Sequence, residues 1–131
     1  MRILIVDDDY VSRAKLTALL STYGQCDAVP NGQIGLQMFQ EAHKELVPYD
    51  LVTMDYEMPD LSGEAVVGQI REMERMMQVD GAKEAKILMV TVKKGMKEVS
   101  ASYSKGCTGY ITKPVTPENL IAALAEIGFK E

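Results

Sequence analysis

Residues 49–63 read YDLVTMDYEMPDLSG, and the rest of the predicted chain is organised around this stretch. Its positions 51–54 form a short, mostly apolar run with β-branched members, which is typical of a strand buried in a sheet. The run stops at Asp55, and Pro59 follows closely; proline neither extends a central strand nor enters a helix interior. Asp55 is therefore predicted to stand where a buried strand leaves its sheet, which is where open α/β sheets carry their functional groups. A solvated aspartate that begins a turn is the alternative for this stretch taken by itself.

Four more apolar runs resemble this one, and a helical pattern follows each of the five. The predicted strands lie near 3–6, 26–29, 51–54, 87–90 and 110–111. The predicted helices lie near 11–23, 33–43, 64–77, 96–105 and 117–127. Because the strands are continuous apolar runs, we expect both faces of the sheet to be covered and the strands to be parallel. The expected fold is α/β, in one domain over residues 1–131, a length that suits a single core.

Apolar spacing also predicts which side chains the helices bury. The clearest pattern is Val66, Ile70, Met73 and Met77, which share one helical face. The apolar residues of the first helix are Val11, Ala14, Leu16, Leu19, Leu20 and Tyr23. The helix near 96–105 has the fewest, namely Met96, Val99 and Tyr103. The last helix, capped by Thr116, is expected to bury Leu120, Ile121, Leu124 and Ile127.

Composition excludes several classes of protein. Fourteen basic and nineteen acidic side chains give a net charge of −5, which argues against direct nucleic-acid binding, because phosphate backbones are bound by clustered Lys and Arg. No apolar run approaches the roughly 20 residues that span a bilayer, so no membrane association is expected. The first residues pass from Met1-Arg2 through four apolar positions into three aspartates, which is not the pattern of a signal peptide. The expected location is the cytoplasm.

Polar residues follow four of the five predicted strands at the point where each strand ends. Asp7 and Asp8 follow the first strand, Asp55 the third, Thr91 the fourth and Lys113 the fifth. Because the carboxyl ends of parallel strands meet at one edge, these side chains are expected to converge on one cleft. Taken singly, each residue has an ordinary explanation as a helix start or a turn residue. Their joint occurrence after four parallel strands favours a shared site.

The chemistry of this set indicates phosphoryl transfer. Clustered carboxylates resist ionisation unless a cation neutralises them, and oxygen ligands with room for water suit Mg²⁺. An aspartate beside Mg²⁺, with an ammonium group and a hydroxyl in reach, is a nucleophile equipped to accept a phosphoryl group.

The sequence resembles the receiver domain of two-component response regulators nearly from end to end. The matching positions are Val6-Asp7-Asp8, Asp55 with Met58-Pro59 and Gly63, Thr91, Tyr110 and Lys113-Pro114. The resemblance implies a flavodoxin-like (βα)5 fold with a five-stranded parallel sheet in the order 2-1-3-4-5. It also implies that Asp55 accepts a phosphoryl group from a phosphohistidine on a sensor histidine kinase or a histidine phosphotransfer protein.

The resemblance further implies a role for each residue of the site. Asp8 and Asp55 would bind Mg²⁺ directly, Asp7 through water, and Glu57 through its backbone carbonyl. Lys113 would bind the phosphate, and its peptide bond to Pro114 is expected to be cis.

Thr91 and Tyr110 would form a switch that changes the face made by the fourth helix, the fifth strand and the fifth helix. A downstream protein would read that face. The chain would not be an enzyme in the usual sense, since it would catalyse only its own phosphotransfer and dephosphorylation.

Three further hypotheses follow from individual residues. Glu57 and Lys93, each two positions past a key residue, carry opposite charges and are predicted to pair across the cleft and hinder attacking water. Cys26 and Cys107 belong to opposite edges of the implied sheet, so both are predicted to be free thiols. His43 is predicted to be a surface residue and not a phosphodonor.

Two other classes share parts of this pattern, and a receiver cut from a longer regulator is a further alternative to a stand-alone one. A haloacid dehalogenase phosphatase also uses Asp, Mg²⁺, Thr and Lys, but it needs a second Asp where this chain has Glu57. A flavodoxin needs a Ser/Thr/Gly-rich phosphate loop after the first strand, where this chain has three aspartates that would repel the cofactor's phosphate.

Overall fold

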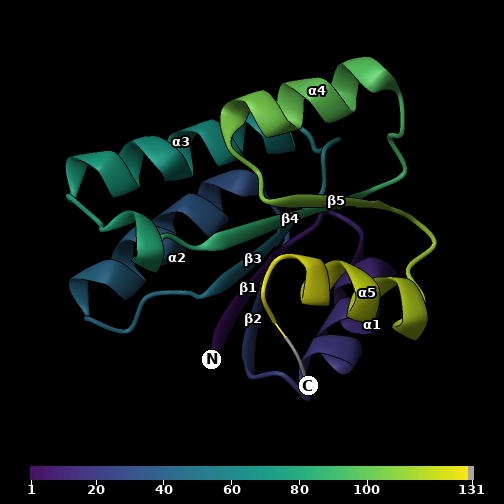
Figure 1. Ribbon diagram of the computed structural model, residues 1–131, viewed down its shortest axis with the longest axis horizontal. Helices are drawn as coiled ribbons and strands as arrows, with labels where there is room; N and C mark the ends of the chain where they lie inside the picture. Colours follow the sequence, from purple (N-terminus) through teal and green to yellow (C-terminus); the bar gives the residue numbers. More distant parts are fainter. Residues whose placement is uncertain (130–131) are drawn as a thin grey trace.

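The structure is a computed structural model that describes residues 1–129, and in it five strands alternate with five α-helices (Figure 1). The strands are β1 (Arg2–Val6), β2 (Gln25–Val29), β3 (Leu51–Met54), β4 (Lys86–Thr91) and β5 (Gly109–Thr112). The helices are α1 (Tyr10–Leu20), α2 (Gly32–Lys44), α3 (Gly63–Met76), α4 (Met96–Lys105) and α5 (Pro117–Glu126). A short 3₁₀ helix (Gly81–Lys83) precedes β4.

The strands form one parallel sheet in the order β2-β1-β3-β4-β5, which confirms the predicted fold class. Val6 pairs with Met54, and Met54 with Met89, so β1 and β3 end at the same level. The residues that follow these two strands, Asp7 and Asp55, therefore leave the sheet side by side.

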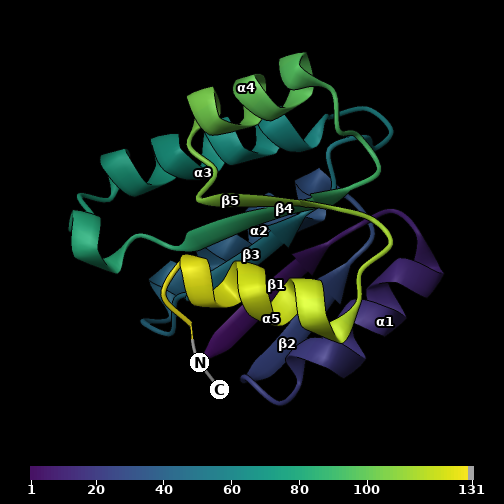
Figure 2. The same ribbon diagram turned by 45° about the vertical axis from the view of Figure 1, so that its right-hand side comes forward.

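The helices form two layers on the sheet (Figure 2). Leu4 and Val6 point into a core beneath α2 and α3, whereas Ile3 and Ile5 point into a second core beneath α1 and α5. Successive strand residues thus serve opposite faces, which explains why the strands are continuously apolar. α4 lies beside α3.

The chain ends each strand and starts each helix largely where the sequence predicts. Asp9 caps α1 by accepting a hydrogen bond from the backbone N–H of Ser12, and Thr116 forms a capping box with Asn119 at the start of α5. None of the helices described is long and apolar enough to cross a membrane. Cys26 and Cys107 are free, as predicted.

Several predicted helix faces are wrong. Val11, Met96 and Ile121 are 70%, 87% and 42% exposed. In α4 the buried side chain is Ser102 and not its neighbour Tyr103. The inward face of the helix is therefore rotated by about one residue from the predicted face of Met96, Val99 and Tyr103. A short side chain there lets the helix approach its neighbours. His43, predicted to be a surface residue, is half-buried, and the centroid of its ring lies 5.1 Å from the centroid of the Phe39 ring.

Candidate functional site

Lys113 brings the predicted site together at the carboxyl edge of the sheet. Its Nζ lies 2.9 Å from Oδ2 of Asp7 and 3.3 Å from Oδ2 of Asp55. These three residues follow β5, β1 and β3, so the contacts join segments that are far apart in the sequence. The peptide bond between Lys113 and Pro114 is cis, as expected.

Three carboxylates meet beside this amine. One oxygen from each of Asp7, Asp8 and Asp55 lies within 4.8 Å of the others. Asp7 and Asp55 are buried, whereas Asp8 is exposed, so the cluster opens to solvent on one side. Oxygen ligands open to water are the donor set that suits Mg²⁺, and the residues present therefore fit this ion.

The electrostatics of the cluster favour an added cation. Burial raises the pKa of the Asp7 carboxyl, against the opposing effect of the backbone N–H of Asp9 and the amine of Lys113. Burial alone would lower the pKa of Lys113, but its bonds to Asp7 and Asp55 outweigh that effect and raise it. Lys113 is thus positively charged at neutral pH. One amine is a small counter-charge for three neighbouring carboxyl groups, so a divalent cation would stabilise the site.

Thr91 and Tyr110, the predicted switch residues, both contact the backbone of Lys93. Thr91 is fully buried, and its Oγ1 accepts a hydrogen bond of 3.2 Å from the N–H of Lys93. The hydroxyl of Tyr110 donates a bond of 2.6 Å to the carbonyl of Lys93. Burial raises the pKa of Tyr110 to about 12, so the hydroxyl keeps its proton at neutral pH. The segment that leads into α4 is therefore held from two strands.

The predicted pair of Glu57 and Lys93 is present. Nζ of Lys93 lies 2.8 Å from Oε2 of Glu57, and this contact raises the pKa of the Lys93 amine. The side chains are 38% and 69% exposed, for Lys93 and Glu57 respectively, so the pair lies at the rim of the site.

Gly63 sits where α3 begins against the end of β3. A Cβ at this position would lie 2.0 Å from the carbonyl oxygen of Asp55, so a larger residue would displace the start of the helix or the strand end that carries Asp55. The N–H of Gly63 instead donates to the carbonyl of Tyr56 at 2.7 Å.

The sequence reasoning missed Arg13. Its Nη1 donates a hydrogen bond of 2.8 Å to the backbone carbonyl of Asp7 and so helps to hold the acidic turn. The available signal was a cation in the first turn of a helix that directly follows three aspartates.

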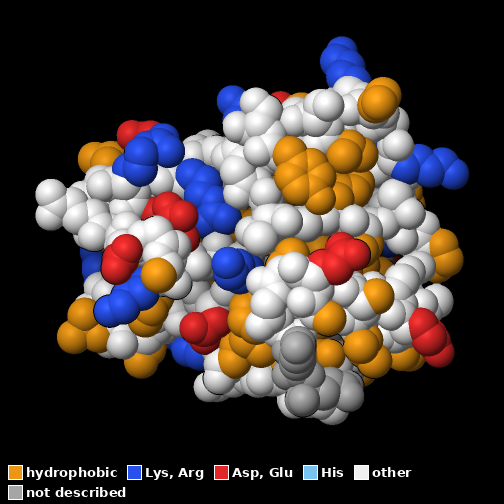
Figure 3. Space-filling model, in the orientation of Figure 1, with side chains coloured by type: hydrophobic (Ala, Val, Ile, Leu, Met, Phe, Trp, Pro, Cys, Tyr) orange, Lys and Arg blue, Asp and Glu red, His pale blue; other side chains and the backbone are white. Residues whose placement is uncertain are grey.

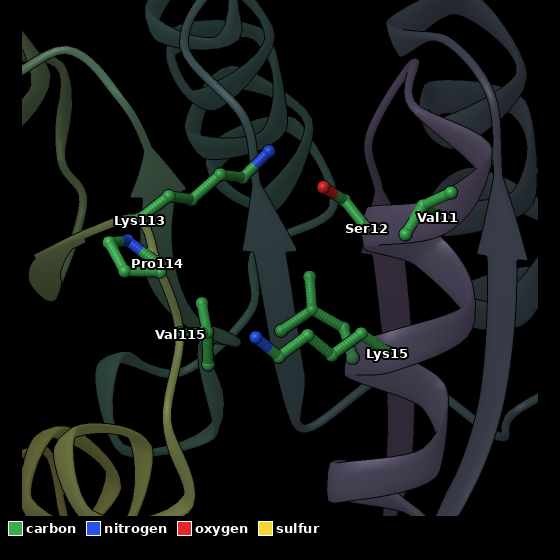
Figure 4. Close-up of a pocket in the computed structure, with 7 residues that line it drawn as sticks. Val11, Ser12, Lys15, Lys113, Pro114 and Val115 are labelled. Carbon is green, nitrogen blue, oxygen red and sulfur yellow. The ribbon is translucent and has the colours of Figure 1, made fainter.

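A depression adjoins the site between the start of α1 and the segment after β5 (Figure 4). It is lined by Val11, Ser12, Lys15, Leu16, Lys113, Pro114 and Val115. Lys113 and Ser12 lie at one end of it, and the amine of Lys15 reaches toward Val115. The surface next to the carboxylates is thus apolar with basic edges.

The family model for the response regulator receiver domain matches residues 3–125. The chain therefore belongs to the family of response regulator receiver domains, the CheY-like phosphoacceptor switches of two-component signalling.

Two curated relatives illustrate the range of the family. The chain is 30% identical over 120 residues to the chemotaxis protein CheY1 of Helicobacter pylori, a match that covers 92% of this chain and 90% of that protein. It is 26% identical over 128 residues to the probable transcriptional regulator ycf29 of Porphyra purpurea, a match that covers 98% of this chain. The chain spans only 56% of the length of the second relative.

Solved structures share the fold. The CheY4 structure of Vibrio cholerae has a TM-score of 0.80 at 24% identity, and the match covers 96% of this chain and 97% of that one. The CheX-CheY-BeF3-Mg²⁺ complex of Borrelia burgdorferi has a TM-score of 0.82 at 21% identity, over 99% and 90% of the two chains.

Proposed function

We propose that this chain is a signalling switch that accepts a phosphoryl group on Asp55. The observation that carries the proposal is the position of the Lys113 amine, 2.9 Å from Asp7 and 3.3 Å from Asp55. In this proposal Asp8, Asp55 and the backbone carbonyl of Glu57 would hold Mg²⁺ directly, and Asp7 would hold it through water.

The proposed transfer starts from a phosphohistidine. A carboxylate oxygen of Asp55 forms a bond to phosphorus as the bond from phosphorus to the imidazole nitrogen breaks, and that nitrogen leaves with the electron pair and takes up a proton. The amine of Lys113 and the hydroxyl of Thr91 bind oxygens of the phosphoryl group. Bound Mg²⁺ would offset the charge on those oxygens, and the chain otherwise contributes mainly positioning.

The proposed donor is a sensor histidine kinase or a histidine phosphotransfer protein, in keeping with the family. A donor must bring its imidazole to Asp55 and therefore cover the surface around it. The depression beside Lys113 supports this, because it is an apolar surface next to the acceptor (Figure 4).

The lack of direct nucleic-acid binding and the cytoplasmic location stay predictions.

The proposed output is the face formed by α4, β5 and α5, which a downstream protein would bind. Thr91 and Tyr110 support this proposal, because both contact the residue that leads into α4. Hydrophobic side chains also gather on the surface between α4 and β5 (Figure 3), and Tyr103 of α4 is 48% exposed. Phosphate contacts would favour one of two packings of this face.

The phosphatase alternative has weaker support. That class needs a second Asp two residues after the nucleophile, and here the position holds Glu57, which is 69% exposed and paired with Lys93. We therefore propose that the chain catalyses only its own phosphotransfer and dephosphorylation.

Incubation with acetyl phosphate and Mg²⁺, followed by intact-mass measurement, tests the proposed acceptor. The wild type is expected to gain one phosphoryl group, and Asp55→Asn none. Asp80→Asn, a change at an exposed aspartate remote from the cluster, should behave as the wild type. Equal phosphorylation of Asp55→Asn and wild type would refute the assignment.

A further inference from the structure

Glu74 is a fully buried acid in α3 that no step of the proposed phosphotransfer uses. Its exposed fraction is 0%. One carboxylate oxygen contacts Nη1 of Arg71 at 2.7 Å, and the other accepts a hydrogen bond of 2.8 Å from the N–H of Ala85. A buried carboxylate with two partners of this kind is held in place, because loss of Arg71 would leave it without its cation and loss of the Ala85 bond would leave an oxygen without a donor.

Arg71 also bonds to the carboxyl end of α4 and to the residues just before β4 and β5. Its Nε donates to the carbonyl of Gly106 at 2.9 Å, Nη1 to the carbonyl of Ala85 at 2.8 Å, and Nη2 to Oγ1 of Thr108 at 3.4 Å. The stem of Arg71 also packs onto Gly106, where a Cβ would lie 2.8 Å from Cγ of Arg71. We call Arg71, Glu74, Ala85, Gly106 and Thr108 the α3 clamp.

Among the described residues, no arginine-centred set of bonds holds the amino end of α4 in the way that Arg71 holds Gly106. The cap residue of the helix is Gly95, which has no side chain that could bond to the first helical N–H groups. The next residue, Met96, is 87% exposed. Ser102 is the only residue within α4 that is buried. The segment just before the helix contacts the two proposed switch residues through Lys93.

We propose that the α3 clamp is the fixed end of the switch, so that phosphorylation displaces the amino end of α4 while the end at Gly106 stays in place. The two ends of α4 differ in their attachments, and the described hydrogen bonds of Thr91 and Tyr110 reach the segment before its amino end through Lys93. A change in these two residues therefore tilts α4 about Gly106. This inference rests on the proposed function, because it assumes that phosphorylation acts through Thr91 and Tyr110.

Residue-resolved hydrogen exchange, measured by NMR on the full chain with and without beryllofluoride and Mg²⁺ as a long-lived mimic of the phosphorylated state, tests the clamp. In the wild type, the exchange rate of the Val99 amide is expected to change by about fivefold or more, and those of Gly106 and Cys107 by less than about twofold.

Two clamp variants and one matched control make the test specific. Arg71→Met combined with Glu74→Leu removes both charged partners, so that no charge is left buried alone. Arg71→Lys keeps a cation beside Glu74 but cannot bond to Gly106, Ala85 and Thr108 together. The control is Arg75→Met with Glu72→Leu, which removes an exposed ion pair of the same spacing from the same helix.

In both clamp variants the change in exchange is expected to spread to Gly106 and Cys107, while phosphorylation of Asp55 by acetyl phosphate continues. The control pair should keep the wild-type contrast between the two ends of α4. The proposal is overturned if, in the clamp variants, the exchange rate still changes at Val99 and not at Gly106 and Cys107. It is also overturned if the exchange rates at both ends of wild-type α4 change by the same factor. If Asp55 is phosphorylated and nothing in α4 changes, the proposed output face fails as well.

Discussion

Lys93 links the site to α4 through three different groups. Its N–H donates to Thr91, its carbonyl accepts from Tyr110, and its amine pairs with Glu57. The first two contacts belong to the backbone, so they do not depend on the identity of the side chain. The third does, and it places an ion pair at the rim of the site, where we predict that it hinders water from reaching a phosphorylated Asp55.

We predict that Glu57→Ala and Lys93→Ala each shorten the lifetime of the phosphorylated form. The expected acceleration of dephosphorylation is about 1.4- to fivefold, which is the range set by the ~0.2–1 kcal/mol that an exposed ion pair contributes. Loss of ³²P label from the purified phosphoprotein measures it. Exchanging the two residues, as Glu57→Lys with Lys93→Glu, should restore much of the lifetime, and unchanged rates in both single variants would exclude the idea.

Residue-level prediction from sequence succeeded where strand ends fix the positions of side chains. Asp7, Asp55 and Lys113 each directly follow a strand, and parallel strands bring such residues together. Arg13 and Glu74 were missed because their contacts depend on which way a helix is rotated and on how far a long side chain reaches. Spacing along the sequence does not determine either quantity.

At the scale of elements, α2 and α3 end in the same strained way. In each, the second residue beyond the helix has a left-handed backbone, with φ of 64° at Leu46 and 56° at Gln78. The N–H of Val47 bonds to the carbonyl of Ala42, the hydrogen-bond pattern of a Schellman motif. α5 ends in this pattern too, with Gly128 at the left-handed position.

We predict that Leu46→Gly stabilises the protein by about 0.5–1 kcal/mol. Glycine removes the steric cost of the left-handed conformation, roughly 1–2 kcal/mol, which exceeds the added entropy of the unfolded chain. Leu46 is 86% exposed, so little buried contact is lost. Urea unfolding measures the change. Gly128→Ala is the opposing control and should destabilise the protein; a loss of stability in Leu46→Gly would contradict the argument.

The faces of α1, α4 and α5 show why elements are easier to locate than to orient. Their bounds follow from caps and glycines in the sequence, such as Asp9, Thr116 and Gly106. Their rotation follows from close packing, which in α4 favours Ser102 over Tyr103 because α4 packs closely beside α3. A count of apolar residues cannot express that preference.

At the scale of the whole molecule, strand order and register bring three carboxylates to one edge of the sheet. A parallel sheet with helices on both faces was predictable because each strand must satisfy two cores. The order β2-β1-β3-β4-β5 was implied by family resemblance and not by the apolar runs themselves. The cost of this topology is electrostatic, since Asp7, Asp8 and Asp55 repel one another, and in residues 1–129 Lys113 is the cation that forms ion pairs with two of them.

We therefore predict that Mg²⁺ stabilises the folded protein through this cluster. At a Mg²⁺ concentration about 100 times its Kd, the free energy of unfolding should rise by about 2.7 kcal/mol. Asp8→Asn removes one ligand and should reduce that gain by more than about 1.4 kcal/mol, the equivalent of tenfold weaker binding. Without Mg²⁺ the same variant should be at least as stable as the wild type, because one repelling charge is gone. Urea unfolding with Mg²⁺ or with EDTA measures both effects, with Asp80→Asn as the control. Equal gains in Asp8→Asn and wild type would place the ion elsewhere.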